Sequence, residues 1–481
     1  MDLAAYRAGA EAFFLSLERE YLLHLSGRQE TLDIEPIYER HADLFRRETV
    51  ETLREGGAPR ELLRFAVEGL IGQATKAEQA ELGRREATLT VVVDGSELGF
   101  RQTAVAQANE PDPERRAAIE RARLDATDES LNPLMREAHD RQAQLVRDLG
   151  WTSTVAMCEE LGDMDLHALG RQADAFLAAS EPSYEDVVGP VVERELDIPF
   201  HRIRRSDLAA FFRAPSLDPG FPAADLVASL DRTIEGMGLT RERIAVDAEE
   251  RPTKSPRAFC APVRVPDEVH LVIAPHGGRD DYEALMHEAG HALHYSHVSR
   301  ELPFEQRCLG DNSVTEGFAF LLQHLVADGA WLHDLLGIRD PTPVLTFLRA
   351  SRLVFLRRYS AKLGYELALH GRPRSPAANA EDHARRLSEA LHVDCPTETW
   401  LSDVDAFFYT ARYLRAWALE THLRRLMRER FGQRWFREPE AGALLVSLWS
   451  EGQTRSADEL LAELTGERLD LSALVADLAL H

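Results

Sequence analysis

The chain has 481 residues, of which 44% are hydrophobic and 28% charged, proportions that are ordinary for a globular protein. Its formal net charge of −25 argues against a nucleic-acid partner, because a phosphate backbone requires a basic face. No stretch approaches the roughly 18 to 20 apolar residues of a membrane-spanning helix, and the charged start does not resemble a secretory signal.

The four cysteines of the chain are widely separated and show no CxxC spacing; they are Cys158, Cys260, Cys308 and Cys395. This pattern favours neither a disulfide framework nor a structural zinc site built from cysteines. We therefore expect a reduced, cytoplasmic protein without a membrane partner. The oligomeric state is left open.

Long amphipathic helical patterns occupy most of the chain. One of them is expected to begin at Asp112, which can cap a helix, and Pro113, which suits a first helical turn. The pattern then runs to about Leu149 and stops at Gly150. Such segments predict a mainly α fold.

Two segments have the character of β-hairpins. Residues 88–106 contain the turn signal Asp94–Gly95, and residues 258–273 contain two apolar runs around a turn at 265–268. Pro262 restricts its strand to a sheet edge or a bulge, because proline has no N–H to donate. The predicted architecture is thus mainly α with one or two small antiparallel β-sheets.

The motif with chemical content is His287-Glu288-Ala-Gly-His291. Residues four apart on a helix share one face and lie about 6 Å apart along its axis, so both imidazoles can bind one tetrahedral ion. Glu288 lies beside that face, where it can act as a general base. This is the HExxH arrangement of zinc peptidases. Asp280 with Glu283 predicts a capping box at the start of the same helix.

A catalytic zinc ion needs a third protein ligand and an open position for water. His297 is rejected, because His294 stands where a glycine would have to turn the chain, and the helix should continue. Asp311 is a minor candidate. Glu316 is favoured, on a separate helix that starts near Ser313. The alternative for Glu316 is a capping box with Ser313 and no metal role.

The stretch His287–His294 with the downstream Glu316 resembles the thimet oligopeptidase and oligoendopeptidase F family, and its relatives around angiotensin-converting enzyme. The resemblance is strongest from Thr253 onward. It implies an elongated, mainly helical, two-lobed peptidase with a deep channel that admits short unfolded peptides. On this basis we expect an N-terminal helical lobe at residues 1–250 and a catalytic zinc-binding part at residues 251–481, within one continuous fold.

The resemblance also implies a substrate-binding edge strand. The strand that pairs with the peptide backbone in the family matches Ala258, Phe259, Cys260 and Ala261. An edge strand offers free N–H and C=O groups to an extended peptide, which makes the role physically reasonable. The alternative is a hairpin that only covers the zinc helix.

Further side chains receive roles in the same way. The family stabilises the oxyanion with a tyrosine from a C-terminal helix, for which Tyr413 is our first choice and Tyr409 our second. The family commonly has tyrosines three residues apart, whereas these are four apart, and ordinary aromatic packing is the alternative. His294 is expected to support the metal ligands from behind, with a buried structural histidine as the alternative. Independently of the resemblance, the candidates for binding a peptide carboxylate are Arg412, Arg415, Lys254 and Arg257.

The expected activity is hydrolysis of short peptides by a zinc metallopeptidase with one Zn²⁺ per chain. His287, His291 and Glu316 would hold the ion, and Glu288 would serve as the general base. Endopeptidase or oligopeptidase action is favoured over carboxypeptidase or dipeptidyl carboxypeptidase action. The alternatives are a catalytically inactive zinc-binding scaffold, which the intact Glu288 disfavours, and a metal-free interaction protein with an accidental motif.

Overall fold

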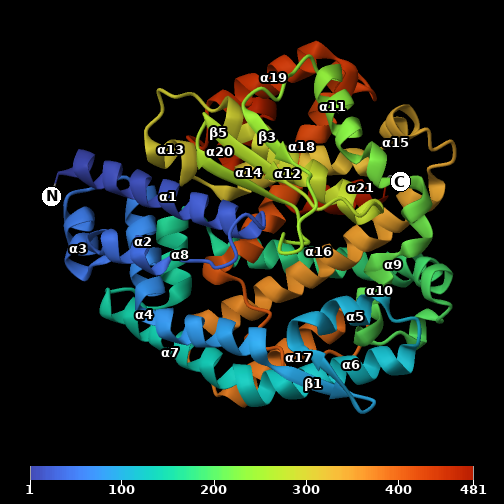
Figure 1. Cartoon of the computed structure of the whole chain (residues 1–481), viewed down its shortest axis with the longest axis horizontal. Helices are drawn as coiled ribbons and strands as arrows, with labels where there is room; N and C mark the ends of the chain where they lie inside the picture. Colours follow the sequence, from blue (N-terminus) through green and yellow to red (C-terminus); the bar gives the residue numbers. More distant parts are fainter. Residues whose placement is uncertain (1, 480–481) are drawn as a thin grey trace. The chain divides into compact units, whose positions relative to one another are not determined.

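A computed structural model describes residues 2–479 of the chain. The described chain consists mainly of α-helices with two small β-sheets (Figure 1), which confirms the predicted class. None of the described helices has the length and apolar character that crossing a membrane requires.

The chain divides into two compact units. Unit 1 comprises Met1–Gly69, Pro215–Leu345 and Arg415–Asp477, and unit 2 comprises Leu70–Ala214, Thr346–Leu414 and Leu478–His481. Four helices begin in one unit and end in the other; they are α4 (Arg60–Thr88), α16 (Thr342–Gly371), α18 (Tyr409–Phe431) and α21 (Ser472–Ala479). The boundaries of these two units therefore differ from the predicted division near residue 250.

The remaining helices and the strands fall within single units. Unit 1 contains α1 (Leu3–Leu25), α2 (Glu35–Arg40), α3 (Arg47–Glu55), α11 (Leu226–Gly236), α12 (Arg279–His297), α13 (Phe304–Cys308), α14 (Asn312–Gln323), α15 (Gly329–Leu336), α19 (Pro439–Ser450), α20 (Ala457–Thr465), β3 (Ile244–Asp247), β4 (Phe259–Arg264) and β5 (Glu268–Val272). Unit 2 contains α5 (Thr103–Asn109), α6 (Pro113–Ala126), α7 (Asn132–Asp148), α8 (Thr154–Gly162), α9 (Leu166–Leu196), α10 (Leu208–Arg213), α17 (Pro376–Leu391), β1 (Thr90–Val93) and β2 (Ser96–Gly99).

The sheet of unit 1 has the strand order β3-β5-β4. The hairpin predicted at residues 258–273 is confirmed, with β4 antiparallel to β5. The register shifts between Ala261 and Arg264, around Pro262, because the proline cannot donate to the ladder. The short strand β3 was not predicted; it pairs parallel to β5, so the sheet is mixed and not purely antiparallel.

Two helices cover this sheet. Leu15 and Leu22 of α1 pack against Ala261 and Val263 of β4 and Val272 of β5. Helix α12 contacts both β4 and β5, and Figure 1 shows α1 and α12 beside the strands. The outer strand β4 is thereby held between the N-terminal helix and the helix that carries the HExxH motif.

The pair of helices α12 and α14 is in especially close contact. A Cβ atom added at Gly290 of α12 would lie 2.5 Å from Ala319 Cα and 2.8 Å from Phe318 O of α14. Only glycine permits this approach, because any side chain would collide with the backbone of the facing helix. The close approach brings the side chains of the two helices together at one place.

In unit 2, the hairpin predicted around residues 94–95 is confirmed. Strands β1 and β2 pair antiparallel, and the two-residue turn places Asp94 and Gly95 at positive φ, of 51° and 77°. The second strand ends at Gly99 and not at Ala106, because the chain turns into helix there.

The long helix predicted from Asp112 to Leu149 is present in two parts. Its start is confirmed, since the Asp112 carboxylate accepts from the N–H of Glu114 at 3.0 Å. A wide helical turn at Thr127–Leu131 then separates α6 from α7. The periodic sequence pattern does not reveal this interruption, because a single wide turn leaves the helical direction nearly unchanged.

Candidate metal centre

Helix α12 begins in a way that the sequence pattern did not indicate. The predicted capping box of Asp280 and Glu283 is wrong, since Gly278 is the N-cap and no side chain caps the helix there. Instead, the Asp281 carboxylate reaches back and accepts from the N–H groups of His276 and Gly277, both at 2.7 Å. Positive φ values at Gly277 and at the N-cap glycine allow this turn into the helix.

Three side chains converge between α12 and α14. His287 Nε2 lies 3.3 Å and His291 Nε2 lies 3.6 Å from the same oxygen, Glu316 Oε2. One ligand atom from each residue lies within 4.8 Å of the others. Glu316 is buried and the two histidines are half-buried. The structure thus brings together the three residues predicted to bind a metal.

The other nitrogen of each histidine ring is held by an uncharged partner. His287 Nδ1 lies 2.9 Å from Gln323 Oε1, and His291 Nδ1 lies 2.9 Å from Thr315 Oγ1. The amide oxygen of Gln323 can only accept, so Nδ1 of a neutral His287 carries the proton and Nε2 keeps its lone pair.

This tautomer provides a test of whether the residues fit a metal ion. A bare imidazole lone pair directed at the Glu316 carboxylate is repulsive unless a proton or a cation lies between them. Two imidazole nitrogens and one carboxylate are also the donor set of catalytic zinc sites. The residues therefore fit a divalent cation of the zinc type. Gln323 and Thr315 could not be identified from the sequence, because nothing local marks them as partners.

The electrostatics of the three groups have a common cause. Burial alone would lower the pKa of His291, but the carboxylates of Glu316 and Glu288 outweigh it and raise that pKa. Burial would likewise raise the pKa of Glu316, but both histidines hold it well below its usual range. The carboxylate is therefore ionised in a buried position, as a metal ligand must be.

Glu288 is held by the backbone of the edge strand. Its Oε2 accepts from the N–H of Cys260 in β4 at 2.8 Å. Glu288 follows His287 directly on α12, so the carboxylate stands beside the three converging ligands, as the motif predicted. The position of β4 at the sheet edge is confirmed, but the N–H of Cys260 points at Glu288 and is already used.

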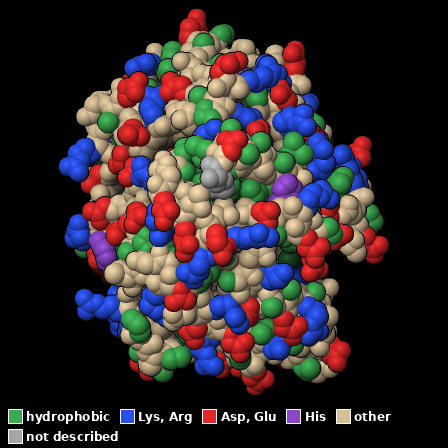
Figure 2. Space-filling view, turned by 90° about the vertical axis from the view of Figure 1, so that its left-hand side faces the viewer, with side chains coloured by type: hydrophobic (Ala, Val, Ile, Leu, Met, Phe, Trp, Pro, Cys, Tyr) green, Lys and Arg blue, Asp and Glu red, His purple; other side chains and the backbone are tan. Residues whose placement is uncertain are grey.

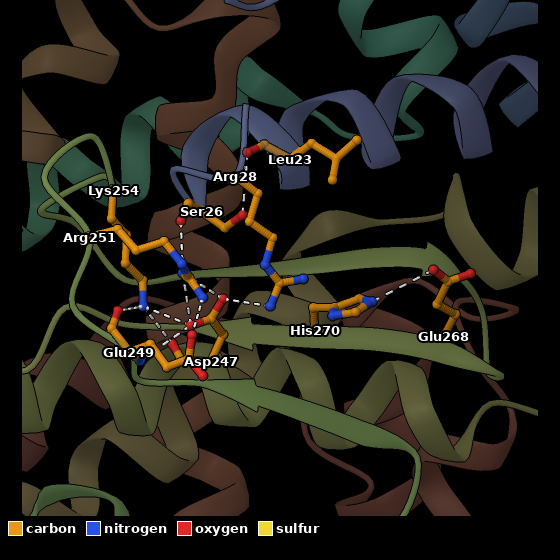
Figure 3. A network of polar contacts seen from close by, with 9 residues as sticks. All are labelled: Leu23, Ser26, Arg28, Asp247, Glu249, Arg251, Lys254, Glu268 and His270. Atoms are coloured by element: carbon orange, nitrogen blue, oxygen red, sulfur yellow. Dashed lines mark hydrogen bonds and ion pairs between the residues drawn. The ribbon is translucent and has the colours of Figure 1, made fainter. Parts of the chain in front are cut away.

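The loop before β4 is fixed by a network around Asp247 (Figure 3). Lys254 is buried, and its Nζ donates to Asp247 O at 2.8 Å, Asp247 Oδ1 at 3.1 Å and Glu249 O at 2.8 Å. Arg28 and Arg251 bind the same aspartate. The predicted contact of Lys254 with a peptide carboxylate is therefore wrong, because all three ammonium protons are engaged within the loop.

The competing third ligands have other roles. The Asp311 carboxylate caps α14 by accepting from the N–H of Ser313 at 2.9 Å, and it pairs with Arg415 at 3.0 Å. The capping box of Ser313 with Glu316, which was the alternative to a metal role, is therefore absent, and Arg415 is not available for a substrate. Helix α12 continues to His297, as expected, and its Nδ1 lies 2.8 Å from Leu293 O.

His294 is fully buried one turn beyond the ligands. Its ring stacks on Tyr295 with centroids 5.4 Å apart and meets Phe318 edge-on at 5.2 Å. Burial lowers the pKa of His294 to about 3, so the ring is neutral. These contacts place it within the packing behind the site, and its role in supporting the ligands stays a prediction.

Tyr409 and Tyr413 lie in unit 2, on the first turns of α18. Their ring centroids are 4.9 Å apart, and Tyr413 also contacts Tyr359 at 5.7 Å. Both tyrosines are half-buried. Their assignment to oxyanion stabilisation stays a prediction.

Comparison with known proteins finds a solved structure with a similar fold. A crystal structure of a "putative oligoendopeptidase F from Bacillus anthracis str. Ames" has a TM-score of 0.61 with this chain at 14% identity. The match covers 96% of this chain and 83% of the other. No protein-family model and no curated protein matches the sequence. At this level of identity the similarity shows the fold alone.

Proposed function

We propose that the protein is a zinc-dependent metallopeptidase that hydrolyses short, unfolded peptides. One observation carries the proposal: two imidazoles, each held at Nδ1, direct Nε2 at a buried carboxylate, with Glu288 next to them. The fold shared with a protein described as an oligoendopeptidase supports the same reading.

His287, His291 and Glu316 would hold the ion. Zinc in such a site supplies Lewis-acid polarisation of a carbonyl group and of water. Glu288 takes a proton from the attacking water and returns it to the departing amine. The N–H of Cys260 orients the Glu288 carboxylate for this work, because a hydrogen bond at Oε2 leaves Oε1 to receive the proton.

The surrounding strand and tyrosines complete the proposal. Strand β4 would guide an extended peptide along Ala258–Ala261, with the Cys260 N–H reserved for Glu288. A hydroxyl group from Tyr413, or else Tyr409, would stabilise the oxyanion. We expect action on internal bonds of oligopeptides, with one zinc ion per chain.

The test compares peptide cleavage by the wild type and by Glu288→Gln. We expect the rate to fall about 10²- to 10⁴-fold, with zinc content unchanged, because the amide cannot accept a proton. Asp280→Asn makes the same chemical change at an exposed position of the same helix and should leave the rate unchanged. Equal cleavage by Glu288→Gln, or no cleavage by the zinc-loaded wild type, would refute the proposal.

The products of a mixed peptide library, identified by mass spectrometry, define the mode of cleavage. An oligopeptidase gives products cut at internal bonds. Release of single residues or of dipeptides from the C-terminus would instead assign the protein to a carboxypeptidase class.

A further inference from the structure

Helix α1 is attached to the rest of unit 1 by its charged side chains. Arg7 pairs with Glu305 at 2.6 Å, Glu11 with Arg307 at 2.6 Å and Arg19 with Glu268 at 2.6 Å; the carboxylate of Glu20 accepts from the N–H of Asp33 at 2.8 Å. Glu18 differs from its neighbours. Across residues 2–479, its carboxylate makes no hydrogen bond or ion pair.

Glu18 lies on the face of α1 that is turned toward the edge strand. It follows Leu15 by three residues and precedes Leu22 by four, and residues at these spacings share one helix face. Both leucines pack against β4. The unpaired carboxylate therefore lies between two apolar contacts, on the side of α1 that meets the strand.

The place that Glu18 faces is next to the candidate metal centre. Burial raises the pKa of the Cys260 thiol, and the carboxylates of Glu288 and Glu18 raise it further. Cys260 is thus close to both carboxylates, and its N–H is the group that holds Glu288. Glu18 and the candidate general base lie near the same residue of β4.

The C-terminal end of helix α1 is tied to the loop that precedes β4. At its C-terminal end, Arg28 binds Asp247 at 2.9 Å and Arg251 donates to Ser26 O at 2.9 Å (Figure 3). Although the Glu18 side chain is only half-buried, desolvation raises its pKa to about 7, which is the cost of ionising a carboxylate without a partner here. A cation brought by a ligand would remove that cost, because it supplies the missing partner.

We propose that Glu18 is a subsite for a cationic group of the peptide, which is either a free α-amine or a Lys or Arg side chain. The inference rests on the proposed function and assigns it a substrate class. The peptide that runs along β4 would place its positive charge against Glu18, while Glu288 acts at the scissile bond. The protein would therefore prefer cationic peptides.

Binding is measured by calorimetry at pH 8 with zinc-loaded Glu288→Gln, which is expected to bind peptides without cutting them. One pair of probe peptides differs only in a free or an acetylated N-terminus. A second set replaces a lysine by norleucine at successive positions. These two arms distinguish the α-amine from the side chain as the source of the charge.

We expect the cationic peptide of one set to bind about tenfold more tightly than its neutral partner, which is the size of one partly buried ion pair. Introducing Glu18→Gln into the Glu288→Gln protein should abolish that difference in affinity. The affinity for the neutral peptide should not change. Adding Glu20→Gln, on the same helix, should preserve the difference. The thermal midpoint of Glu18→Gln should equal or exceed that of the parent, because the amide removes an unpaired charge, and this excludes misfolding as the cause.

Two results would overturn the subsite: equal affinity for cationic and neutral peptides, or a preference that survives Glu18→Gln. Failure of the proposed function has a different signature. In that case the wild type would cleave no peptide, whereas the charge preference and its dependence on Glu18 would still be measurable in the binding experiment.

Discussion

At the scale of single residues, the ring partners of the histidines decide how well the site is prepared for a metal. Thr315 and Gln323 hold His291 and His287 at Nδ1, both at 2.9 Å, which fixes the ring orientation and the tautomer. Neither partner is charged. The ligand set therefore carries only the single negative charge of Glu316.

The first prediction concerns Thr315. In Thr315→Val the Nδ1 group of His291 loses its partner, and we expect zinc affinity to fall about 10- to 100-fold. The measurement is competition with a chromophoric chelator. Thr421→Val makes the same change elsewhere in unit 1 and should leave the affinity as it is. Unaltered zinc affinity in Thr315→Val would show that the ring needs no support from Oγ1.

The sequence indicated the residues of this site unequally. His287, Glu288 and His291 could be recognised because a spacing of four on one helix is a local property. Glu316 was favoured as the third ligand once the HExxH motif was recognised, but its own surroundings also allowed a capping box with Ser313. The contact of Glu288 with Cys260 could not be predicted, because its donor is a backbone N–H that every residue except proline has.

At the scale of elements, the pair α12–α14 sets the distance between the histidines and Glu316. In Gly290→Ala the new Cβ atom would collide with the backbone of α14. We expect a loss of about 1–3 kcal/mol in the free energy of unfolding, together with weaker zinc binding, because the helices must separate.

The control for this second prediction is Gly72→Ala, in the interior of α4. No atom lies within 4 Å of the new Cβ there, so the higher helix propensity of alanine should stabilise the protein by up to about 1 kcal/mol. Thermal unfolding of both variants provides the comparison. A stabilising Gly290→Ala would contradict the close packing of α12 on α14.

A third prediction concerns the loop that precedes α18 in unit 2. Glu366 is fully buried and accepts from the N–H of Asp405 at 2.8 Å, while the hydroxyl of Thr410 lies at 3.0 Å. That hydroxyl also lies 2.8 Å from Asp405 Oδ2. Because it has only one proton, it can donate to only one of the two carboxylates at a time. Burial raises the pKa of Glu366 to about 8, although nearby Lys362 opposes the shift.

The sign of the pH effect follows from that pKa. The folded protein binds the proton of Glu366 more tightly than the unfolded chain, whose value is 4.5, so this contribution to stability is complete below pH 4.5 and is lost as the pH rises to about 8. Relative to the wild type, Glu366→Gln should therefore become more stable between pH 5 and 8. Denaturant unfolding measures this, with the exposed Glu381→Gln as control. Parallel stability curves for the wild type and Glu366→Gln would refute the shifted pKa.

The predicted elements were recovered where local signals decide them. The Asp94–Gly95 hairpin and the bulge around Pro262 follow from the conformational limits of glycine and proline. Strand β3 was missed because it depends on a distant partner, whereas the start of α12 was predicted wrongly although its contacts are local. The first needs β5 to pair with, and the second uses Asp281 in place of the expected capping box.

At the scale of the whole molecule, helical periodicity predicted the class of fold, but the division into two units could not be predicted. Each unit is assembled from three separate segments. Four of the five crossings lie inside the helices α4, α16, α18 and α21, and only the crossing between Ala214 and Pro215 lies outside an α-helix. Acidic and basic side chains are interspersed on the face shown in Figure 2, so the net charge of −25 forms no uniformly acidic surface there.

A fourth prediction concerns the stability of the chain as a whole. A ligand that binds only the folded state stabilises it by mass action, about 4 kcal/mol at a thousandfold excess over its Kd. Zinc should therefore raise the midpoint of thermal unfolding, and a chelator should lower it. His291→Ala should unfold at the same temperature with and without zinc. A zinc-dependent midpoint in that variant would place the ion elsewhere.

The central claim, that His287, His291 and Glu316 form a zinc site, is tested most directly by the metal content of the protein purified without added zinc. Elemental analysis should find about one zinc ion per chain in the wild type and in Glu288→Gln. It should find none in His291→Ala, which lacks one of the three ligands. A wild type without metal, or a His291→Ala variant that retains zinc, would contradict the account.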